Sequence, residues 1–108
     1  MLDIYYADFD TTVIPSDPGC LELAGSIDLD AHRLLAAPFD KARQAGADLR
    51  YFDDTLLEPE QVVILLSILL TNEYVLEGNE HALAAFNSMR DLLERAAKRG
   101  VGLVAFAD

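Results

Sequence analysis

The chain has 108 residues, of which 52% are apolar, so it has the size of one domain and the composition of a folded one. Its formal net charge of −11, from 19 acids against 8 bases, repels phosphate backbones and anionic lipid, which argues against nucleic-acid and membrane partners. A basic protein surface would be attracted instead. The one cysteine, Cys20, cannot form an internal disulfide, and the start of the chain lacks a signal-peptide pattern, so we expect a cytoplasmic protein.

The first predicted element is a strand from Leu2 to Phe9, because this segment is rich in β-branched and aromatic residues. Period-two spacing places three of its residues on one face: Leu2, Ile4 and Tyr6. Residues 11–19 contain two prolines and a glycine and predict a loop. Residues 20–24 predict either a turn or a brief helical piece.

The next predicted element is a helix that begins at Asp28 or Asp30, either of which can cap it, and that ends near Ala45. Gly46 suits the left-handed backbone conformation in which many helices terminate. Pro38 lies inside this segment. Because proline removes a helical hydrogen bond and clashes with the preceding turn, we expect a kink or two short helices.

A second strand is predicted over residues 48–52, followed by a helix that begins at Pro59, since proline at the first helical position followed by Glu and Gln is typical of a helix start. This helix runs to about Leu70 and is apolar nearly all round, so we expect it to be the buried centre of the fold. Its valines and isoleucines also suit a strand, but its length and Pro59 favour a helix.

The longest predicted helix is capped by Asn79 and ends near Arg99, just before Gly100. Residues 101–107 predict a closing strand. The sequence therefore predicts a single α+β domain with the element order β-α-β-α-α-β: a small sheet and three main helices, with the central apolar helix innermost.

The charges are distributed unevenly along the chain. The first 30 residues hold seven acids and no base, and residues 51–89 hold seven more acids, again without a base. All eight bases lie in 33–50 and 90–99. If the acid-only segments share a face, that face carries a concentrated negative field.

Two aspartate pairs are the nearest approach to a metal site: Asp8 with Asp10, and Asp53 with Asp54. Neither pair has the further ligands that known metal-binding motifs supply. Asp53 and Asp54 also precede a helix start, where carboxylates satisfy free backbone N–H groups. We therefore expect capping or solvation at these positions and no bound metal.

The candidates for nucleophilic or acid–base chemistry are Cys20, His32 and His81. No basic neighbour activates the cysteine, and neither histidine has a nearby third ligand that would complete a zinc site. We expect both histidines on the surface and Cys20 to be a small buried side chain. The sequence predicts no catalytic residue and no cofactor.

The run from Tyr51 to Gln61, Tyr-Phe-Asp-Asp-Thr-x-Leu-x-Pro-Glu-Gln, follows a predicted helix and precedes an apolar one. Over residues 31–72 this pattern resembles segments of the small acidic immunity proteins of bacterial polymorphic-toxin and secretion-system loci. The resemblance implies a cytoplasmic binder that neutralises a toxin by covering its active site. It also implies an acidic surface where the toxin is a basic nuclease, and it supplies no catalytic residues.

The leading hypothesis is a protein-binding module, immunity-like, that presents an acidic face to a basic toxin domain. The candidate partner-binding residues are carboxylates with neighbouring tyrosine anchors: Asp8, Asp10, Tyr51, Asp53, Asp54, Glu58, Glu60, Glu73, Tyr74 and Glu77. One alternative is a homo-oligomeric structural or regulatory domain, because the helix over 61–70 is more apolar than a small sheet can cover. A second alternative is a small divalent-metal enzyme built on the aspartate pairs.

Overall fold

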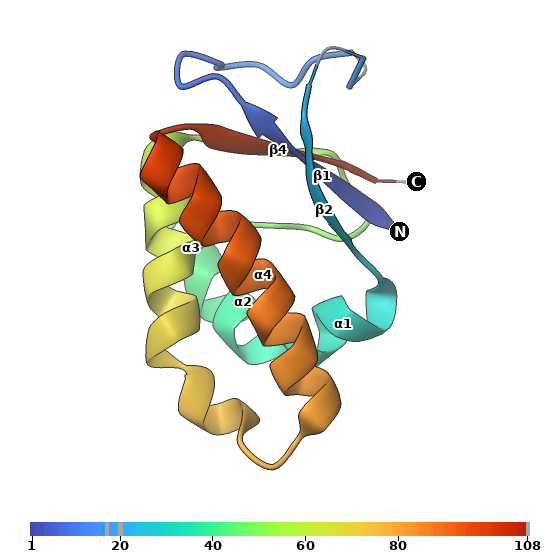
Figure 1. The fold of residues 1–108 in the computed structure, drawn as a ribbon, viewed down its shortest axis with the longest axis vertical. Helices are drawn as coiled ribbons and strands as arrows, with labels where there is room; N and C mark the ends of the chain where they lie inside the picture. The colour runs from blue at the N-terminus through green and yellow to red at the C-terminus, as the bar shows by residue number, and fades with distance from the viewer. Residues whose placement is uncertain (17, 20, 108) are drawn as a thin grey trace.

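A computed structural model describes residues 1–16, 18–19 and 21–107 of the chain. Within these residues one antiparallel sheet is formed by β1 (Leu2–Ala7), β2 (Leu23–Ile27), β3 (Thr55–Leu57) and β4 (Gly102–Ala107). The strand order is β2-β1-β4-β3, so the first and last strands of the chain lie side by side in the centre, and β2 and β3 form the two edges (Figure 1).

The helices lie on one side of this sheet (Figure 1). They are α1 (Leu29–Leu34), α2 (Ala36–Gln44), α3 (Pro59–Thr71) and α4 (Glu80–Arg99), and a 3₁₀ turn, η1 (Glu73–Leu76), connects the last two. Helix α3 contacts α2, α4, β3 and β4, as expected of the central helix. The predicted α+β class with three main helices is confirmed. None of the described helices is both long and apolar enough to cross a bilayer.

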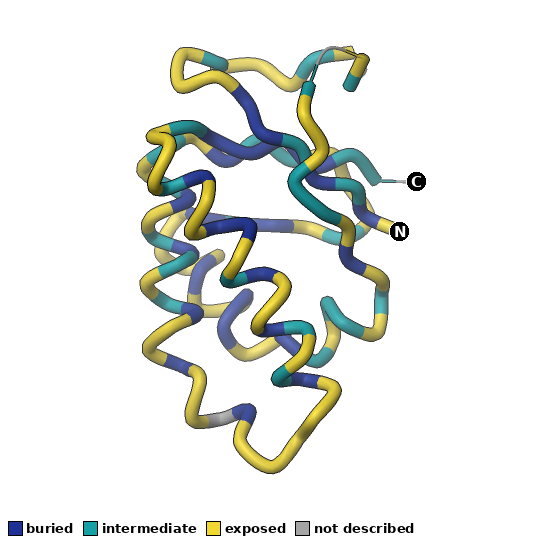
Figure 2. The backbone as a smooth tube through the Cα atoms, viewed as in Figure 1, coloured by how far each residue is buried: buried dark blue, intermediate teal, exposed yellow. Residues whose placement is uncertain are grey.

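The core lies between the sheet and the helices, where the buried parts of the chain face one another (Figure 2). The predicted alternation along β1 is confirmed, because Leu2, Ile4 and Tyr6 are all buried. In the register with β4, Ile4 lies opposite Ala105 and Tyr6 opposite Leu103, so one face of the central strand pair is continuously apolar. The helices add further buried side chains: Val62, Leu65, Leu69, Phe86, Met89 and Leu93.

The helix ends follow the predicted chemistry. The side chains of Asp28 and Asn79 each accept a hydrogen bond from a backbone N–H in the first turn of α1 and α4, at 2.7 and 3.0 Å. Beyond the other ends of α2 and α4, Gly46 and Gly100 have φ values of +95° and +69°. Side chains with a Cβ rarely adopt this conformation, so glycine terminates both helices.

The break expected near Pro38 is present, because α1 ends at Leu34 and α2 begins at Ala36. Pro38 lies in the first turn of α2 and is buried. A backbone N–H in that turn has no acceptor within its own helix, so proline loses no helical hydrogen bond there. The two-helix form of the prediction is therefore correct.

The strand predicted over residues 48–52 is wrong. Leu49 is buried and Arg50 exposed, so the segment does alternate, but no described strand pairs with it. Arg50 Nε instead donates to Asp48 Oδ2 at 2.7 Å and its guanidinium pairs with Asp53 at 3.6 Å; these carboxylates raise the pKa of the Arg50 guanidinium. The chain bends through residues 51–53 and becomes a strand only at β3.

The turn or brief helical piece predicted over residues 20–24 holds as a turn at Leu21, whose backbone N–H donates to the Pro18 carbonyl oxygen at 2.9 Å, but it is wrong from Leu23, where β2 begins. The β2 sequence, Leu-Ala-Gly-Ser-Ile, contains a single β-branched residue and predicts no strand by composition. Pairing with β1 produces the strand in spite of this weak propensity. The interpretation of Cys20 lies outside the described residues.

Candidate protein-binding surfaces

The acidic segments of the chain do not form one face. Asp8 and Asp10 lie in the loop after β1, at one end of the molecule's longest axis, which measures 39 Å (Figure 1). Glu73 and Glu77 lie at the opposite end, around η1. The structure therefore does not bring the ten predicted partner-binding residues together on one surface. They lie in separate groups with different surroundings.

Two of the predicted carboxylates contribute hydrogen bonds to the fold. Asp54 Oδ1 accepts a hydrogen bond from the backbone N–H of Ala107 at 2.9 Å. Glu58 is the N-cap of α3 in a capping box, in which its side chain accepts from the backbone N–H of Gln61, and Gln61 Oε1 accepts from the Glu58 backbone N–H at 2.7 Å. These side chains have a structural role whether or not they contact a partner.

Tyr51 is half-buried in an aromatic cluster. Its ring centroid lies 5.6 Å from that of His32 and 5.1 Å from that of Phe52. His32 also stacks on Phe39 at 4.6 Å and donates a hydrogen bond from Nε2 to the carbonyl oxygen of Leu49 at 2.9 Å. The expectation that His32 is a surface residue holds only in part, because these contacts leave it half-buried; His81 is exposed as expected.

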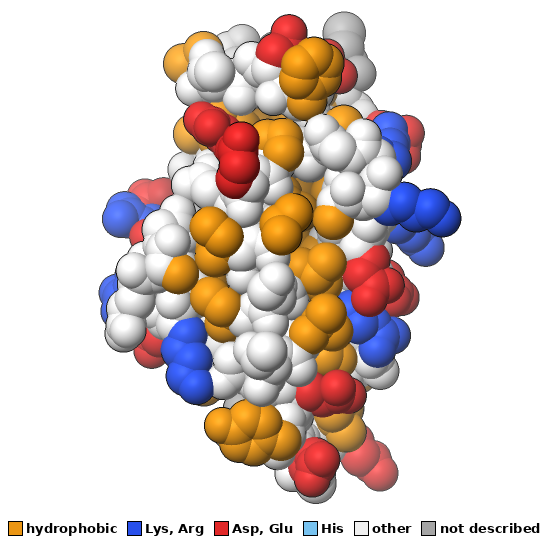
Figure 3. Space-filling model, turned by 90° about the vertical axis from the view of Figure 1, so that its left-hand side faces the viewer, with side chains coloured by type: hydrophobic (Ala, Val, Ile, Leu, Met, Phe, Trp, Pro, Cys, Tyr) orange, Lys and Arg blue, Asp and Glu red, His pale blue; other side chains and the backbone are white. Residues whose placement is uncertain are grey.

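A row of exposed apolar side chains lies on α3 and continues onto η1. Val63, Leu70 and Tyr74 are 51%, 43% and 64% exposed, and with the exposed Ser67 they follow the spacing of one helix face. We call these four residues the α3 outer stripe. Figure 3 views this side of the molecule and shows hydrophobic side chains gathered along its middle. The expectation that α3 is buried is thus correct for its inner face only.

Carboxylates lie at the two ends of the α3 outer stripe. Glu60 is exposed in the first turn of α3, and Glu73 and Glu77 are exposed beyond its last turn. On this face the Lys and Arg side chains lie toward the sides (Figure 3). Of the residues predicted from sequence, Glu60, Glu73, Tyr74 and Glu77 are therefore the ones that share a surface.

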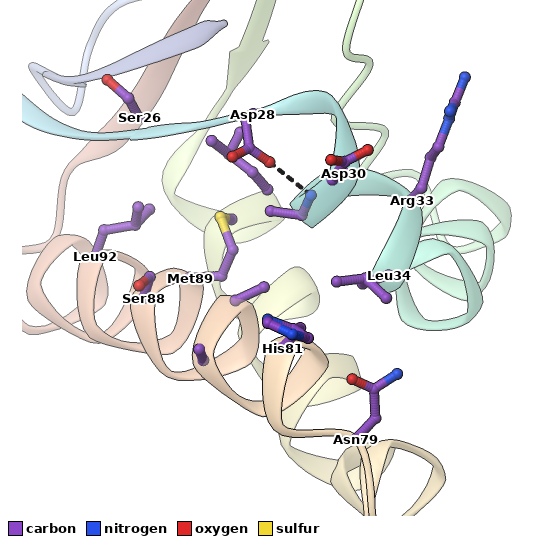
Figure 4. A pocket seen from close by; sticks show the side chains of 14 residues that line it. Ser26, Asp28, Asp30, Arg33, Leu34, Asn79, His81, Ser88, Met89 and Leu92 are labelled. Carbon is purple, nitrogen blue, oxygen red and sulfur yellow. Dashed lines mark hydrogen bonds between the residues drawn. The ribbon is translucent and has the colours of Figure 1, made fainter.

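A groove of about 830 Å³ runs between α1 and α4 and begins at the end of β2. Its floor is apolar, with Leu34, Met89 and Leu92 among the lining residues (Figure 4). Asp28 and Asp30 line the α1 side, and Asn79, His81 and Ser88 line the α4 side. The hydrogen bond drawn in Figure 4 is the cap of α1, in which Asp28 Oδ1 accepts from the backbone N–H of Ala31 at 2.7 Å.

Within the described residues, no three His, Cys, Asp or Glu side chains lie close enough together to hold a metal ion. The two predicted aspartate pairs lie in different parts of the fold: Asp8 and Asp10 follow β1, whereas Asp53 and Asp54 precede β3. The structure therefore gives the metal-enzyme alternative no support from side-chain geometry.

The sequence contained a signal for the α3 outer stripe but none for the groove. An all-round apolar helix in a domain of two layers must leave some apolar side chains uncovered, and for this reason oligomerisation through residues 61–70 is an alternative. The groove instead depends on how α1 packs relative to α4, and no sequence motif in either helix predicts that packing.

The fold and these surfaces define a small two-layer α+β domain with an exposed apolar helix face and an acidic groove. Comparison of the chain with models of known protein families gives no match, and comparisons with curated proteins and with solved structures give no significant match.

Proposed function

We propose that this domain is a protein-binding module that uses the α3 outer stripe as the centre of its interface. The observation that carries the proposal is the alignment of Val63, Leu70 and Tyr74 on the solvent side of a helix whose inner side is fully packed. Single exposed apolar residues are ordinary, but aligned groups of them are typical of interfaces. An apolar centre that includes a tyrosine has the composition of an interface core.

The charge pattern around the stripe favours a basic partner. Glu60 lies at one end and Glu73 and Glu77 at the other, within a chain of net charge −11. A partner with Lys or Arg at matching positions would gain ion pairs at the rim and associate faster at low salt. The partner's basic groups should lie toward the ends of the stripe, because the domain's own bases lie along the sides.

Self-association through the same stripe is the second candidate function, since an exposed apolar helix face also suits a dimer. Charge argues against it. If two copies packed their α3 helices antiparallel, Glu60 of each would face Glu73 and Glu77 of the other; if parallel, like residues would meet. Both arrangements place carboxylates against carboxylates, so we favour a different, basic protein as the partner.

We further propose, from the resemblance to immunity proteins, that the partner is a toxin domain that meets this chain in the bacterial cytoplasm and that binding neutralises it. The acidic composition supports this proposal when the toxin is a basic nuclease, since the stripe and its carboxylates would then occupy a surface that otherwise contacts nucleic acid. The test is genetic as well as biochemical: a partner that arrests growth when expressed alone should cease to do so when this chain is co-expressed.

The binding proposal is tested with the full tagged chain as bait in extracts of the source cells. The unaltered chain should retain a basic protein that the Val63→Asp, Leu70→Asp double variant does not retain. Raising the salt concentration should reduce the amount of this protein that the unaltered chain captures. Val13→Asp is the matched control, because Val13 is 76% exposed in the loop at the far end of the molecule. Circular dichroism checks that all forms are folded.

Retention of the same protein by the double variant would exclude the α3 outer stripe as the interface. Sedimentation velocity over a wide concentration range separates the second candidate: reversible dimerisation that is abolished by the double variant supports self-association, whereas a monomer at every concentration excludes it.

A further inference from the structure

Strand β2 is an open edge of the sheet. It pairs only with β1, in the register Leu2 with Ile27 and Ile4 with Gly25. Tyr6 donates its backbone N–H to the carbonyl oxygen of Glu22 at 2.9 Å, so the even-numbered residues of β1 direct their backbone toward β2. The alternation of an antiparallel ladder then directs the backbone N–H and C=O of Ser26 outward, where no described strand pairs with them.

This edge lacks most of the features by which proteins protect exposed strands. It carries no charged residue and no proline, and its bulge lies at the Leu23 end, so pairing is regular from Gly25 to Ile27. An added strand would find a free donor and acceptor at Ser26, the middle residue of that regular stretch. The edge can therefore serve as a template for an extended peptide.

The groove between α1 and α4 begins where this edge ends, because Ser26 and Ile27 belong to its lining (Figure 4). Gly25 lies against the groove floor: a Cβ added there would be 3.2 Å from Leu92 Cδ2. Successive side chains of a strand point to opposite faces, so every second side chain of a peptide added to β2 would face the helices. Those side chains would meet the apolar floor around Met89 and Leu92.

The charge of the groove defines the peptide further. Asp28 uses one carboxylate oxygen to cap α1, and among the described residues neither its second oxygen nor the Asp30 side chain has an ion-pair partner. Arg33 also belongs to the groove lining, with its side chain extended away from the other lining residues in Figure 4, so the two carboxylates outnumber the one cation. A Lys or Arg next to the apolar side chains would complement the two carboxylates. A second copy of this chain would instead bring carboxylates to carboxylates.

We propose that the β2 edge and the groove form a second binding site, which takes an extended peptide segment of a partner protein by strand addition. The peptide alternates, with apolar side chains entering the groove and a Lys or Arg reaching Asp28 and Asp30. This site is separate from the α3 outer stripe and does not depend on the function proposed for it.

The test begins with selection of random peptides displayed on phage against the full chain. The selected peptides should alternate, carry a basic residue, and perturb the NMR amide signals of Ser26, Asp28 and Leu92. Methylation of single backbone nitrogens in the selected peptide then tests strand addition without altering the protein. Binding should weaken at least tenfold, about the loss of one well-formed hydrogen bond, at one amide in the stretch facing Ser26 and stay nearly unchanged at the next.

Two protein variants test the charges and the independence of the site. Asp28→Asn keeps the cap of α1, since asparagine caps as well as aspartate. The Asp28→Asn, Asp30→Asn double variant should bind the basic peptide about threefold more weakly, or less tightly still. The Val63→Asp, Leu70→Asp variant should bind the peptide unchanged. The proposal is overturned if no peptide is selected, or if methylation at successive peptide amides weakens binding equally. It is also overturned if the peptide perturbs NMR signals only elsewhere in the domain, including on α3.

Discussion

Asp54 Oδ1 accepts a hydrogen bond from the backbone N–H of Ala107 at 2.9 Å, which ties the turn before β3 to the last residue of β4. Ala107 pairs with Leu2 on the other side of β4, so this bond gives the end of the central strand a partner where the short β3 no longer reaches. A carboxylate that the sequence placed among the partner-binding residues thus has a role in the sheet.

Replacing Asp54 with alanine should lower the free energy of unfolding by about 1 kcal/mol, because the Ala107 N–H loses its acceptor. Asp53→Ala is the matched control. Among the described residues, the Asp53 side chain makes only an exposed ion pair with Arg50 at 3.6 Å, and its loss should change stability by less than about 0.5 kcal/mol. Urea unfolding of both variants measures the difference, and equal stabilities would show that the Asp54 hydrogen bond contributes nothing.

Leu69 and Leu70 are adjacent in α3 and should respond very differently to truncation. Leu69 is 0% exposed, so Leu69→Ala should destabilise the fold by about 2–5 kcal/mol through lost burial and a residual cavity. Leu70 is 43% exposed in the α3 outer stripe, and Leu70→Ala should remain within about 1 kcal/mol of the unaltered chain. A large loss at Leu70 would mean that the stripe stabilises the fold and has not been left free for a partner.

Most of the fold was predictable because its signals are local. Helix caps such as Asn79, terminators such as Gly100 and the alternation of β1 each follow from a few neighbouring residues. The errors arose where tertiary pairing decides the outcome. Residues 48–52 alternate like a strand but lack a neighbour, whereas β2 has weak strand propensity and is formed by pairing with β1.

The candidate surfaces were less predictable for the same reason. The sequence showed that acids cluster along the chain, but it could not show that Asp10 and Glu77 lie at opposite ends of a 39 Å axis. Only Glu60, Glu73, Tyr74 and Glu77 remained on a common surface, because they follow one helix and its continuation into η1. The sequence predicts the helix that contains Val63 and Leu70 as the buried centre, since apolar residues on all sides of a helix do not reveal which side the domain covers.

Gly102 should tolerate no side chain, for a reason that differs from that at Gly100. A Cβ at Gly102 would overlap the carbonyl oxygen of Leu57 in the β3–β4 pair. Gly102→Ala should therefore cost about 1–3 kcal/mol and loosen β3, visible as faster amide exchange at Leu57. Gly100→Ala has open space around it and should cost about 1–2 kcal/mol through its φ of +69° alone, leaving exchange at Leu57 unchanged. Unchanged Leu57 exchange in Gly102→Ala would contradict the close approach.

Gln61 uses both ends of its side-chain amide, and two substitutions separate their contributions. Oε1 accepts from the Glu58 N–H at 2.7 Å, and Nε2 donates to the Gly46 carbonyl oxygen at 2.8 Å, which joins the start of α3 to the end of α2. Gln61→Ala removes both bonds and should cost about 1–2 kcal/mol in urea unfolding. Gln61→Glu keeps the capping acceptor but has no donor for Gly46, so its stability should fall between those of the alanine variant and the unaltered chain. Gln44→Ala, at an exposed position without a described side-chain hydrogen bond, provides the control. If Gln61→Glu is as stable as the unaltered chain, the link to Gly46 does not hold the two helices together.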